Sequence, residues 1–557
     1  MPRTTSRLLT QLFCRSWDDV SNDLLAGPLQ SPTIMDDTIF SRAFVPLVVT
    51  LLSLVLTYIR SLLNWSARTR GRPLPPGPRP WPLIGNMFDF PGLRPWRKFL
   101  ELTDKYGDIV HLRVSGEDFV IIGSAEVANE ILNKRSANTA DRPALAVVEL
   151  SGQDVNFATF PYGQWWRRHR RSFWQQFHPG VIPRYLHIQR EGTYKFLASL
   201  LESPSRLREN IAYTFQGVIL KTVYGIDVDP DDERLAIASA ALETVSQTTG
   251  RSIVETLPFL RYVPSWFPGA GFQKEFAKSK YANHRLKNEL FDEARAAIER
   301  GEQRSCVVAE LLERRRKSIS DPDEEQVMKH VCAVAIEGSS DTTGYTLEGF
   351  FLAMAMYPDV QRKAQAELDK VVGLNRLPDH NDSDELVYIN AVVKEALRWH
   401  AVMPLGLWHR TIADDELNGY FIPRGTMVWT NVWSILHDPK AYEDPFAFRP
   451  ERFIKDGKLD PTVRDPADYL FGFGRRICPG RYFAIPSLFI NMASALHVFD
   501  ISLPLGDNGK PIPVEYKETH GLLSRPENLP CVVKPRSAAA EALIREVQRT
   551  AVLTTGL

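Results

Sequence analysis

The stretch that decides this fold reads Phe471-Gly-Phe-Gly-Arg-Arg-Ile-Cys-Pro-Gly480, with a helix-like run starting at Arg481. It places one cysteine, Cys478, among glycines, a proline and arginines. Glycine lets the backbone turn tightly and approach a flat ligand closely. Amide dipoles at a helix start and nearby arginines are expected to lower the pKa of Cys478 and favour its thiolate. The stretch therefore predicts a metal ligand or a nucleophile.

Two other interpretations stay open on these residues alone. An isolated cysteine is often a small buried hydrophobic side chain without chemistry. Gly472-x-Gly474 also matches half of a dinucleotide-binding loop, although Ile477 stands where the third glycine belongs. The rest of the chain has to decide among the three.

Composition narrows the class of protein. The chain has 557 residues, a length that allows three or four domains or one large fold. Lys plus Arg and Asp plus Glu are both 67, so net charge gives no sign of nucleic acid as a partner. Five cysteines without a CxxC pair predict neither a disulfide framework nor a zinc site, and they suit a reducing compartment.

The N-terminal region predicts a membrane anchor. Residues 1–42 are polar and mixed and are expected to be a disordered extension. Residues 43–63 form the predicted transmembrane anchor, because Ala43–Ile59 carries no charge and is just long enough to span a bilayer as a helix. A signal peptide is disfavoured because no small-residue cleavage site follows. Arginines after the segment and aspartates before it place the rest of the chain in the cytosol.

The remaining chain is expected to be mostly helical. Residues 64–85 form a Pro-rich linker, because prolines cannot join a helix or a central strand. Residues 86–537 are expected to form the large globular domain, and 538–557 a C-terminal tail. Within the domain, 109–114 and 119–122 predict a hairpin, and strands are expected near 419–430. Ser124 is expected to cap the helix that follows it.

Three segments carry polar residues in suggestive patterns. Tyr162–Arg171 is rich in arginine and has Trp166 and Arg170 on one helical face, which fits a solvated basic face or a clamp for a carboxylate-bearing ligand. The helix predicted over Asp323–Tyr357 contains Glu337-Gly-Ser-Ser-Asp-Thr-Thr343, either a weakened helix or a proton relay. In Leu386–Trp399, periodicity predicts an exposed ion pair between Glu395 and Arg398.

Together these segments resemble the cytochrome P450 superfamily, the haem-thiolate monooxygenases, from the anchor to about Val533. Phe471-x-x-Gly474-x-Arg476-x-Cys478-x-Gly480 matches the haem-binding loop, a highly specific signature. The resemblance implies a mainly α fold with a minor β region, in one large catalytic domain with an N-terminal transmembrane helix.

The resemblance also assigns roles to residues. Cys478 is expected to be the axial thiolate ligand of haem b. The residues expected to bind the rest of the haem are Trp166, Arg170, His409, Phe471, Arg476 and Gly480. Asp341 and Thr342 match the catalytic acid–threonine pair over the distal haem face. Glu395, Arg398 and Arg452 match a buried structural triad, against the exposed pair that periodicity predicts.

Two departures from the family pattern affect these assignments. Gly338 and Ser339 stand where the family usually has Ala-Gly, which adds a hydroxyl near the oxygen site. Trp408 stands where similar sequences often carry proline, and this leaves the register of His409 open.

The implied activity is insertion of one oxygen atom from O2 into a lipophilic small molecule. Thiolate ligation favours O–O cleavage. Electrons are expected from a separate NADPH-cytochrome P450 reductase, with cytochrome b5 as an optional second donor, both at the endoplasmic reticulum membrane. The candidate docking patch for the reductase is Arg167, Arg168, Arg171 and Arg481.

Other activities on the same fold remain alternatives. An isomerase or dehydratase of this fold works without external electrons, but Asp341-Thr342 argues against it; a third alternative is a haem carrier or gas sensor. The predicted cavity-lining segments, 144–148, 402–407 and 520–523, are mostly apolar, which favours a lipophilic substrate. The overall pattern is similar to fungal enzymes of terpenoid or polyketide secondary metabolism.

Overall fold

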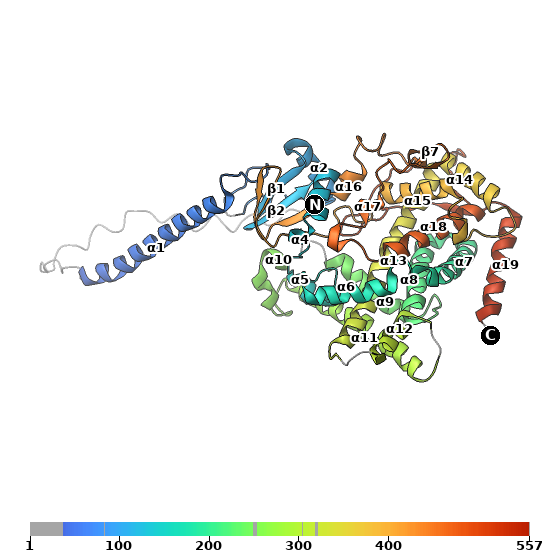
Figure 1. The fold of residues 1–557 in the computed structure, drawn as a ribbon, viewed down its shortest axis with the longest axis horizontal. Coiled ribbons are helices and arrows are strands. Elements are labelled where there is room, and N and C mark those ends of the chain that lie inside the picture. The colour runs from blue at the N-terminus through green and yellow to red at the C-terminus, as the bar shows by residue number, and fades with distance from the viewer. Residues whose placement is uncertain (1–36, 83, 249–252, 303–304, 318–320, 556–557) are drawn as a thin grey trace, which may run out of the picture. The chain divides into compact units, whose positions relative to one another are not determined.

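The computed structural model describes residues 37–82, 84–248, 253–302, 305–317 and 321–555. The chain divides into two units, Met1–Gly71 and Arg72–Leu557 (Figure 1). Most of the predicted N-terminal extension, 1–36, lies outside the described residues.

The first unit contains one long helix, α1 (Asp37–Thr69). Its segment Pro46–Thr69 is 24 residues long, and the most apolar window of that segment has a mean hydropathy of 1.8 and is not buried. By length and composition it can cross a membrane. Residues 64–69, predicted as linker, continue this helix, which ends where Arg70 and Gly71 take positive φ angles of 50° and 76° ahead of Pro73.

The second unit is dominated by helices. Those of its first half are α2 (Pro95–Tyr106), α3 (Ala125–Ala128), α4 (Ser136–Thr139), α5 (Ala146–Leu150), α6 (Gln164–Phe177), α7 (Leu186–Glu202), α8 (Leu207–Tyr224), α9 (Glu233–Thr248), α10 (Ile253–Thr256) and α11 (Gly271–Glu299). Those of its second half are α12 (Val307–Lys317), α13 (Glu324–Met356), α14 (Pro358–Val371), α15 (Val387–Trp399), α16 (Val432–Leu436), α17 (Ala467–Leu470), α18 (Arg481–Val498) and α19 (Ala538–Thr555).

A four-stranded sheet forms the minor β region, in the order β1-β2-β6-β3. Its strands are β1 (Ile109–Val114), β2 (Glu117–Ile122), β6 (Met427–Thr430) and β3 (His409–Arg410). β1 and β2 form the predicted antiparallel hairpin, β2 and β6 run parallel, and β3 is antiparallel to β6. The pairing of β3 with β6 fixes the backbone of His409 opposite Val428.

Three two-stranded ribbons complete the β structure of the described residues. They pair β4 (Asp415–Leu417) with β5 (Tyr420–Ile422), β7 (Ile454–Lys455) with β8 (Lys458–Leu459), and β9 (Phe499–Ser502) with β10 (Val532–Pro535). β5 and β6 confirm the strands predicted near 419–430.

The predicted cap at Ser124 is wrong in its chemistry. α3 does begin at Ala125, but the Ser124 side chain makes no capping hydrogen bond and its buried hydroxyl has no partner. The chain then widens into a π-helix over Asn129–Lys134. π-helical turns often occur at functional sites. The carbonyl of Leu132, inside this segment, lies against the cysteine loop described below.

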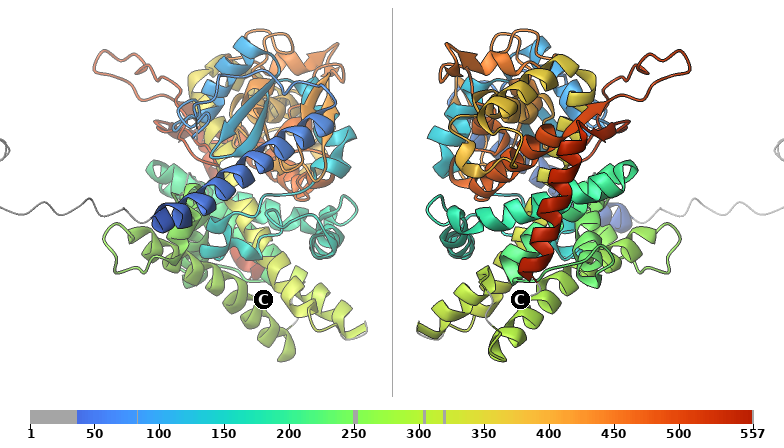
Figure 2. Two further views of the ribbon diagram at one scale, coloured as in Figure 1. Left: turned by 90° about the vertical axis from the view of Figure 1, so that its left-hand side faces the viewer. Right: turned by 90° about the vertical axis from the view of Figure 1, so that its right-hand side faces the viewer.

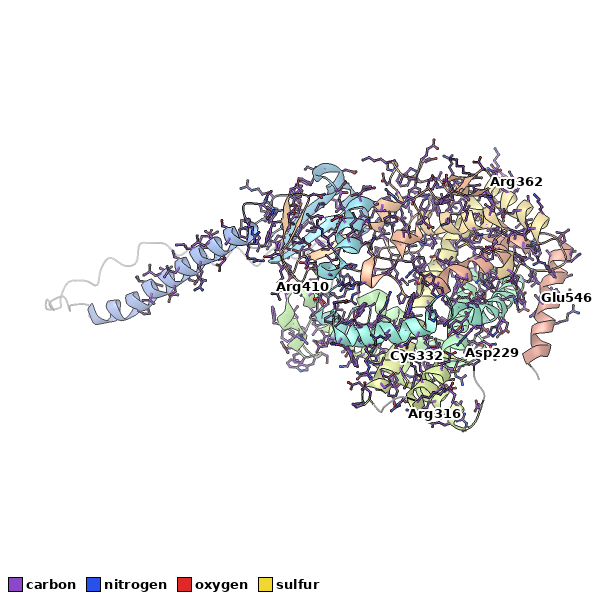
Figure 3. The ribbon with its side chains drawn as sticks, viewed as in Figure 1. Asp229, Arg316, Cys332, Arg362, Arg410 and Glu546 are labelled. Atoms are coloured by element: carbon purple, nitrogen blue, oxygen red, sulfur yellow. The ribbon has the colours of Figure 1, made fainter. Side chains whose placement is uncertain are left out.

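The central helix of the large unit is α13, which packs against α6, α8, α11, α15 and α18. Most of its side chains are buried, as expected for a helix that is apolar almost all round. Cys332, labelled in Figure 3, is fully buried on this helix, and burial raises the pKa of its thiol well above the usual value. It is therefore an inert core residue.

The C-terminal tail ends in an ordered helix, α19. It packs along α7 and also contacts α18, as Figure 2 shows on its right-hand side. Leu543 and Ile544 are buried in this contact. The predicted tail is thus part of the packed unit.

Candidate functional site

The cysteine loop is built by its glycines. Gly472 and Gly474 have φ angles of 80° and 50°, in the left-handed region that favours glycine. A Cβ on Gly474 would lie 2.3 Å from the carbonyl oxygen of Leu132, so a side chain there would push the loop off the π-helix. The loop ends at Gly480, from which α18 begins.

The backbone holds Cys478 inside this loop. Its N–H donates to the carbonyl of Phe471 at 2.7 Å, and Arg481 Nη1 donates to the Cys478 carbonyl at 2.9 Å. Burial raises the pKa of the Cys478 thiol, opposed by the backbone amide of Gly480 and by Arg170 and Arg481. The lowered pKa predicted from the sequence is wrong, because desolvation outweighs the dipoles and charges.

Cys478 lines a cavity of about 320 Å³ between the loop, α6 and α13. Eight of the predicted site residues line the same cavity: Trp166, Arg170, Thr342, His409, Phe471, Arg476, Cys478 and Gly480. The predicted substrate-lining segments also reach it, through Val147, Val148, Val402, Met403, Leu405, Gly406, Leu407, Leu522 and Leu523. Elements distant in the sequence therefore converge on one space.

Three arginines give the cavity a positive wall. Arg170 on α6 donates to the carbonyl of Ile477, and Arg476 donates to the carbonyls of Ala140 and Phe160, both at 2.7 Å. Burial lowers the pKa of Arg170 and of Arg476 to about 10. The guanidinium of Arg476 also lies 4.4 Å from the centre of the Trp166 ring. Trp166 and Arg476 therefore fix each other's position.

The third arginine, Arg142, was not expected from the sequence. It is buried, lines the cavity and donates to the carbonyls of Ala158 and Trp408. Burial and the neighbouring Arg476 lower its pKa well below the usual value. Its sequence context, Asp141-Arg142-Pro143, contains no pattern that indicates a ligand-binding arginine.

His409 sits beside this arginine group. Its Nδ1 lies 2.8 Å from the carbonyl of Thr139, and it is 5% exposed. Burial and the charge of Arg142 lower the pKa of His409 well below its usual value. The imidazole is therefore neutral, with Nδ1 donating to the carbonyl.

Helix α13 contributes one wall through its Gly-Ser-rich turn. Gly338, Ser339, Thr342 and Thr343 line the cavity. The Thr342 hydroxyl donates to the carbonyl of Gly338 at 2.7 Å, the backbone competition expected from the sequence. The hydroxyl of Ser339 is buried and has no partner, which leaves it available to a ligand or water.

Asp341 lies on a different side of α13. It is absent from the cavity lining, and its carboxyl accepts from the Tyr345 hydroxyl at 3.4 Å. Burial raises the pKa of Asp341, while Tyr345 and Arg525 oppose the rise. The structure thus separates the two members of the predicted catalytic pair, with Thr342 facing the cavity and Asp341 behind it.

The pair Glu395–Arg398 is fully buried, so the exposed pair predicted from periodicity is wrong. Arg398 uses all its donors, on both carboxylate oxygens of Glu395 at 2.7 and 2.8 Å and on the carbonyls of Leu436, Pro445 and Ala447. Arg452 joins through Nε, 3.2 Å from Glu395. The prediction from periodicity is wrong because segments later in the sequence, around 436–447, cover the polar face of α15.

A further acidic residue, Glu337, also lines the cavity. Its carboxyl accepts from the side-chain amides of Gln153 at 3.2 Å and Asn156 at 2.8 Å. Burial raises the pKa of Glu337 to about 7. The sequence shows Glu337 four residues before Asp341, but it does not show that Gln153 and Asn156 would contact this carboxyl group.

Comparisons with known proteins agree with this geometry. Residues 75–530 match the model of the family described as Cytochrome P450. A cytochrome P450 monooxygenase, COX2, of Coprinopsis cinerea is 39% identical over 86% of this chain and 93% of its own. Cytochrome P450 monooxygenase 208 of Postia placenta is 40% identical over 86% and 93%. The tryptamine 4-monooxygenase of Psilocybe cyanescens is 36% identical over 88% and 98%.

The family match covers most of the large unit, including the cysteine loop, the buried triad and the cavity wall on α13. Its relatives are named monooxygenases, which are oxidoreductases. This chain belongs to the cytochrome P450 family.

Proposed function

We propose that this protein is a haem-dependent monooxygenase that inserts one oxygen atom from O2 into a lipophilic small molecule of fungal secondary metabolism. The observation that carries the proposal is the convergence of Cys478, the arginine wall and Thr342 on one cavity. The family implies a haem-thiolate cofactor, and its fit to these residues is the first test.

The residues of the cavity suit haem b. Arg142, Arg170 and Arg476 direct hydrogen bonds to backbone carbonyls, so their charge is available to an anionic ligand. Buried arginines with lowered pKa values favour a ligand that brings carboxylates into the site. Haem carries two propionates, and Cys478 supplies the sulfur that thiolate ligation requires. Trp166, Phe471 and Gly480 line the same cavity.

When bound, haem supplies the oxygen chemistry, which thiolate ligation directs toward O–O cleavage. The protein positions the haem and the substrate, excludes water from the cavity and delivers protons. The three arginines and His409 would hold the propionate edge of the haem. The apolar residues of 402–407 and 522–523 would keep water out of the cavity. The Thr342 hydroxyl is placed to donate to a group in the cavity when it releases the carbonyl of Gly338. Asp341 is proposed to pass protons along α13.

Electrons are proposed to come from a separate NADPH-cytochrome P450 reductase at the endoplasmic reticulum membrane, with α1 as the anchor and the large unit in the cytosol. Arg167 and Arg171 are exposed and suit an acidic docking surface. Arg168 is less available than predicted, because it pairs with Asp321 and Glu324, both at 2.8 Å. The proposal therefore places the docking contact mainly on Arg167 and Arg171.

Reconstitution tests this function. The full chain, purified with haem and combined with a fungal reductase, is expected to convert lipophilic metabolites only when NADPH and O2 are both present. Turnover without NADPH would contradict the proposal and favour the isomerase or dehydratase alternative.

A spectrum tests the ligand separately. The reduced protein with carbon monoxide is expected to show the red-shifted Soret band of thiolate ligation, and Cys478→Ser is expected to lose it. Cys531→Ser is the matched control, because Cys531 is a free cysteine outside the cavity lining. Survival of the band in Cys478→Ser would show that another residue is the ligand.

A further inference from the structure

Glu337 is an acidic side chain in the wall of a mostly apolar cavity. It projects from α13 one residue before the Gly-Ser turn, lines the cavity and is 7% exposed. A buried carboxylate is costly unless its charge is compensated by hydrogen bonds and by a cation. The groups that compensate the charge of Glu337 therefore indicate which ligand the cavity accepts.

The described residues fill only part of the hydrogen-bonding capacity of the Glu337 carboxyl group. Gln153 donates to one oxygen and Asn156 to the other. Gln153 also donates to Asn283, which in turn donates to the carbonyl of Ser151 at 2.9 Å, so the amides are held in place. An ionised carboxylate accepts about four hydrogen bonds. Two acceptor positions of Glu337 are left for a ligand.

No cation of the described residues offsets its charge. Burial raises the pKa of Glu337, and the neutral amides of Gln153 and Asn156 are what oppose the rise. Glu348, on the same helix, is a contrast: its pKa is also raised to about 7, but Arg208 lies 3.6 Å away and Arg525 contributes as well. Glu348 therefore has a counter-ion within the protein, whereas Glu337 has none among the residues that the structure describes.

We infer that Glu337 binds a protonated amine on the substrate, so that the cavity takes lipophilic molecules carrying one basic nitrogen. The surrounding wall is apolar, with Val147, Val148 and Leu522 among its residues. A ligand with an apolar body and one cationic nitrogen matches both parts of this wall. The amine supplies the missing counter-charge, and its N–H donates to the free acceptor positions. The inference rests on the proposed function, since it names the substrate class of the same cavity.

A matched pair of probes tests the inference. One probe is a naphthyl-alkyl tertiary amine, and the other is its carbon isostere, in which a CH group replaces the nitrogen. Equilibrium dialysis with the haem-loaded full chain measures the affinity for each. The wild-type protein is expected to bind the amine more tightly, and Glu337→Gln is expected to weaken amine binding by about tenfold or more, because one partner of a buried charge pair is lost. The affinity for the isostere is expected to stay unchanged.

Glu348→Gln is the control, because it removes a buried carboxyl from the same helix outside the cavity lining. It is expected to change neither affinity. Equal loss of both probes in Glu337→Gln would show that Glu337 only braces the loop at 153–156, and would overturn the inference. A difference spectrum of nitrogen ligation would place the amine on the iron and would overturn it too. Dialysis needs no turnover, so failure here leaves the reductase-dependent activity to its own test.

Discussion

Arg398 shows how much depends on one buried charge pair. The same spacing of three residues gives an exposed pair at Lys98–Glu101, with side chains 49% and 65% exposed, and a fully buried one at Glu395–Arg398. Exposed pairs contribute little because water already solvates both partners. Removing one partner of a buried pair instead leaves the other charge uncompensated.

Arg398→Met is therefore expected to destabilise the protein by about 3–5 kcal/mol, or to prevent folding of the haem-loaded form. The free energy of unfolding in urea measures the effect, and haem retention gives a second readout. Lys98→Met, at the exposed pair, is the control and is expected to leave the unfolding midpoint where it is. Equal effects of the two changes would contradict the energetic distinction between them.

At the scale of elements, α13 joins the core of the large unit to the cavity. Two of its hydroxyl-bearing residues donate hydrogen bonds to the helix backbone, Ser340 to Ile336 at 3.0 Å and Thr342 to Gly338 at 2.7 Å. These two residues have the same local bond but different surroundings. Thr342 lines the cavity, whereas Ser340 is buried away from it.

Thr342→Ala is expected to uncouple NADPH oxidation from product formation, because a hydroxyl that orders protons at the cavity is lost. The ratio of product to NADPH consumed should fall several-fold, with peroxide or water formed instead. Ser340→Ala is the matched control and is expected to keep the ratio. An unchanged ratio in Thr342→Ala would count against the proton-relay role.

The contact between α6 and α13 contains a pair of buried histidines. His169 Nδ1 lies 2.9 Å from the carbonyl of Trp165, and His169 Nε2 lies 3.1 Å from His330 Nδ1. The hydrogen bonds fit two neutral rings, with His330 donating to His169. Burial and the neighbouring histidine lower the pKa of His330 to about 3. Protonation of His330 would place a charge and an Nε2–H without a partner in the core.

This pair predicts acid sensitivity. The folded-state pKa of His330 is below its unfolded value near 6.5, so its contribution to stability is complete above that pH and is lost as pH falls toward about 3. His330→Phe is expected to reduce the slope of unfolding free energy against pH by up to about 1.4 kcal/mol per pH unit below pH 6. Urea denaturation at several pH values measures it. An unchanged slope would show that the pair does not contribute.

At the scale of the whole molecule, the chain divides into two units with different surfaces. Between Leu47 and Leu63, α1 presents exposed apolar side chains, and the family match lies in the other unit. The large unit has its own core and cavity. Its segment near 259–267 exposes Phe259, Tyr262, Trp266 and Phe267.

Deleting residues 1–71 is therefore expected to release most of the protein from membranes while the ferrous–carbon monoxide band persists. Flotation with liposomes measures membrane binding, and the spectrum measures haem retention. In the truncated chain, Trp266→Ser is expected to lower any remaining liposome binding, since it removes an exposed aromatic side chain. Loss of haem on truncation would contradict the independence of the large unit.

The amino-acid sequence by itself determined the family, the cysteine loop and the helix-rich class, because these depend on local patterns: glycine spacing, a lone cysteine before a helix, and apolar periodicity. The tertiary structure decided which charges are buried and what they face. Glu395 lies in the core, Arg142 and Glu337 line the cavity, and Asp341 lies outside the cavity lining. Burial depends on segments hundreds of residues apart packing together, and desolvation by that packing raises the pKa of both Cys478 and Glu337.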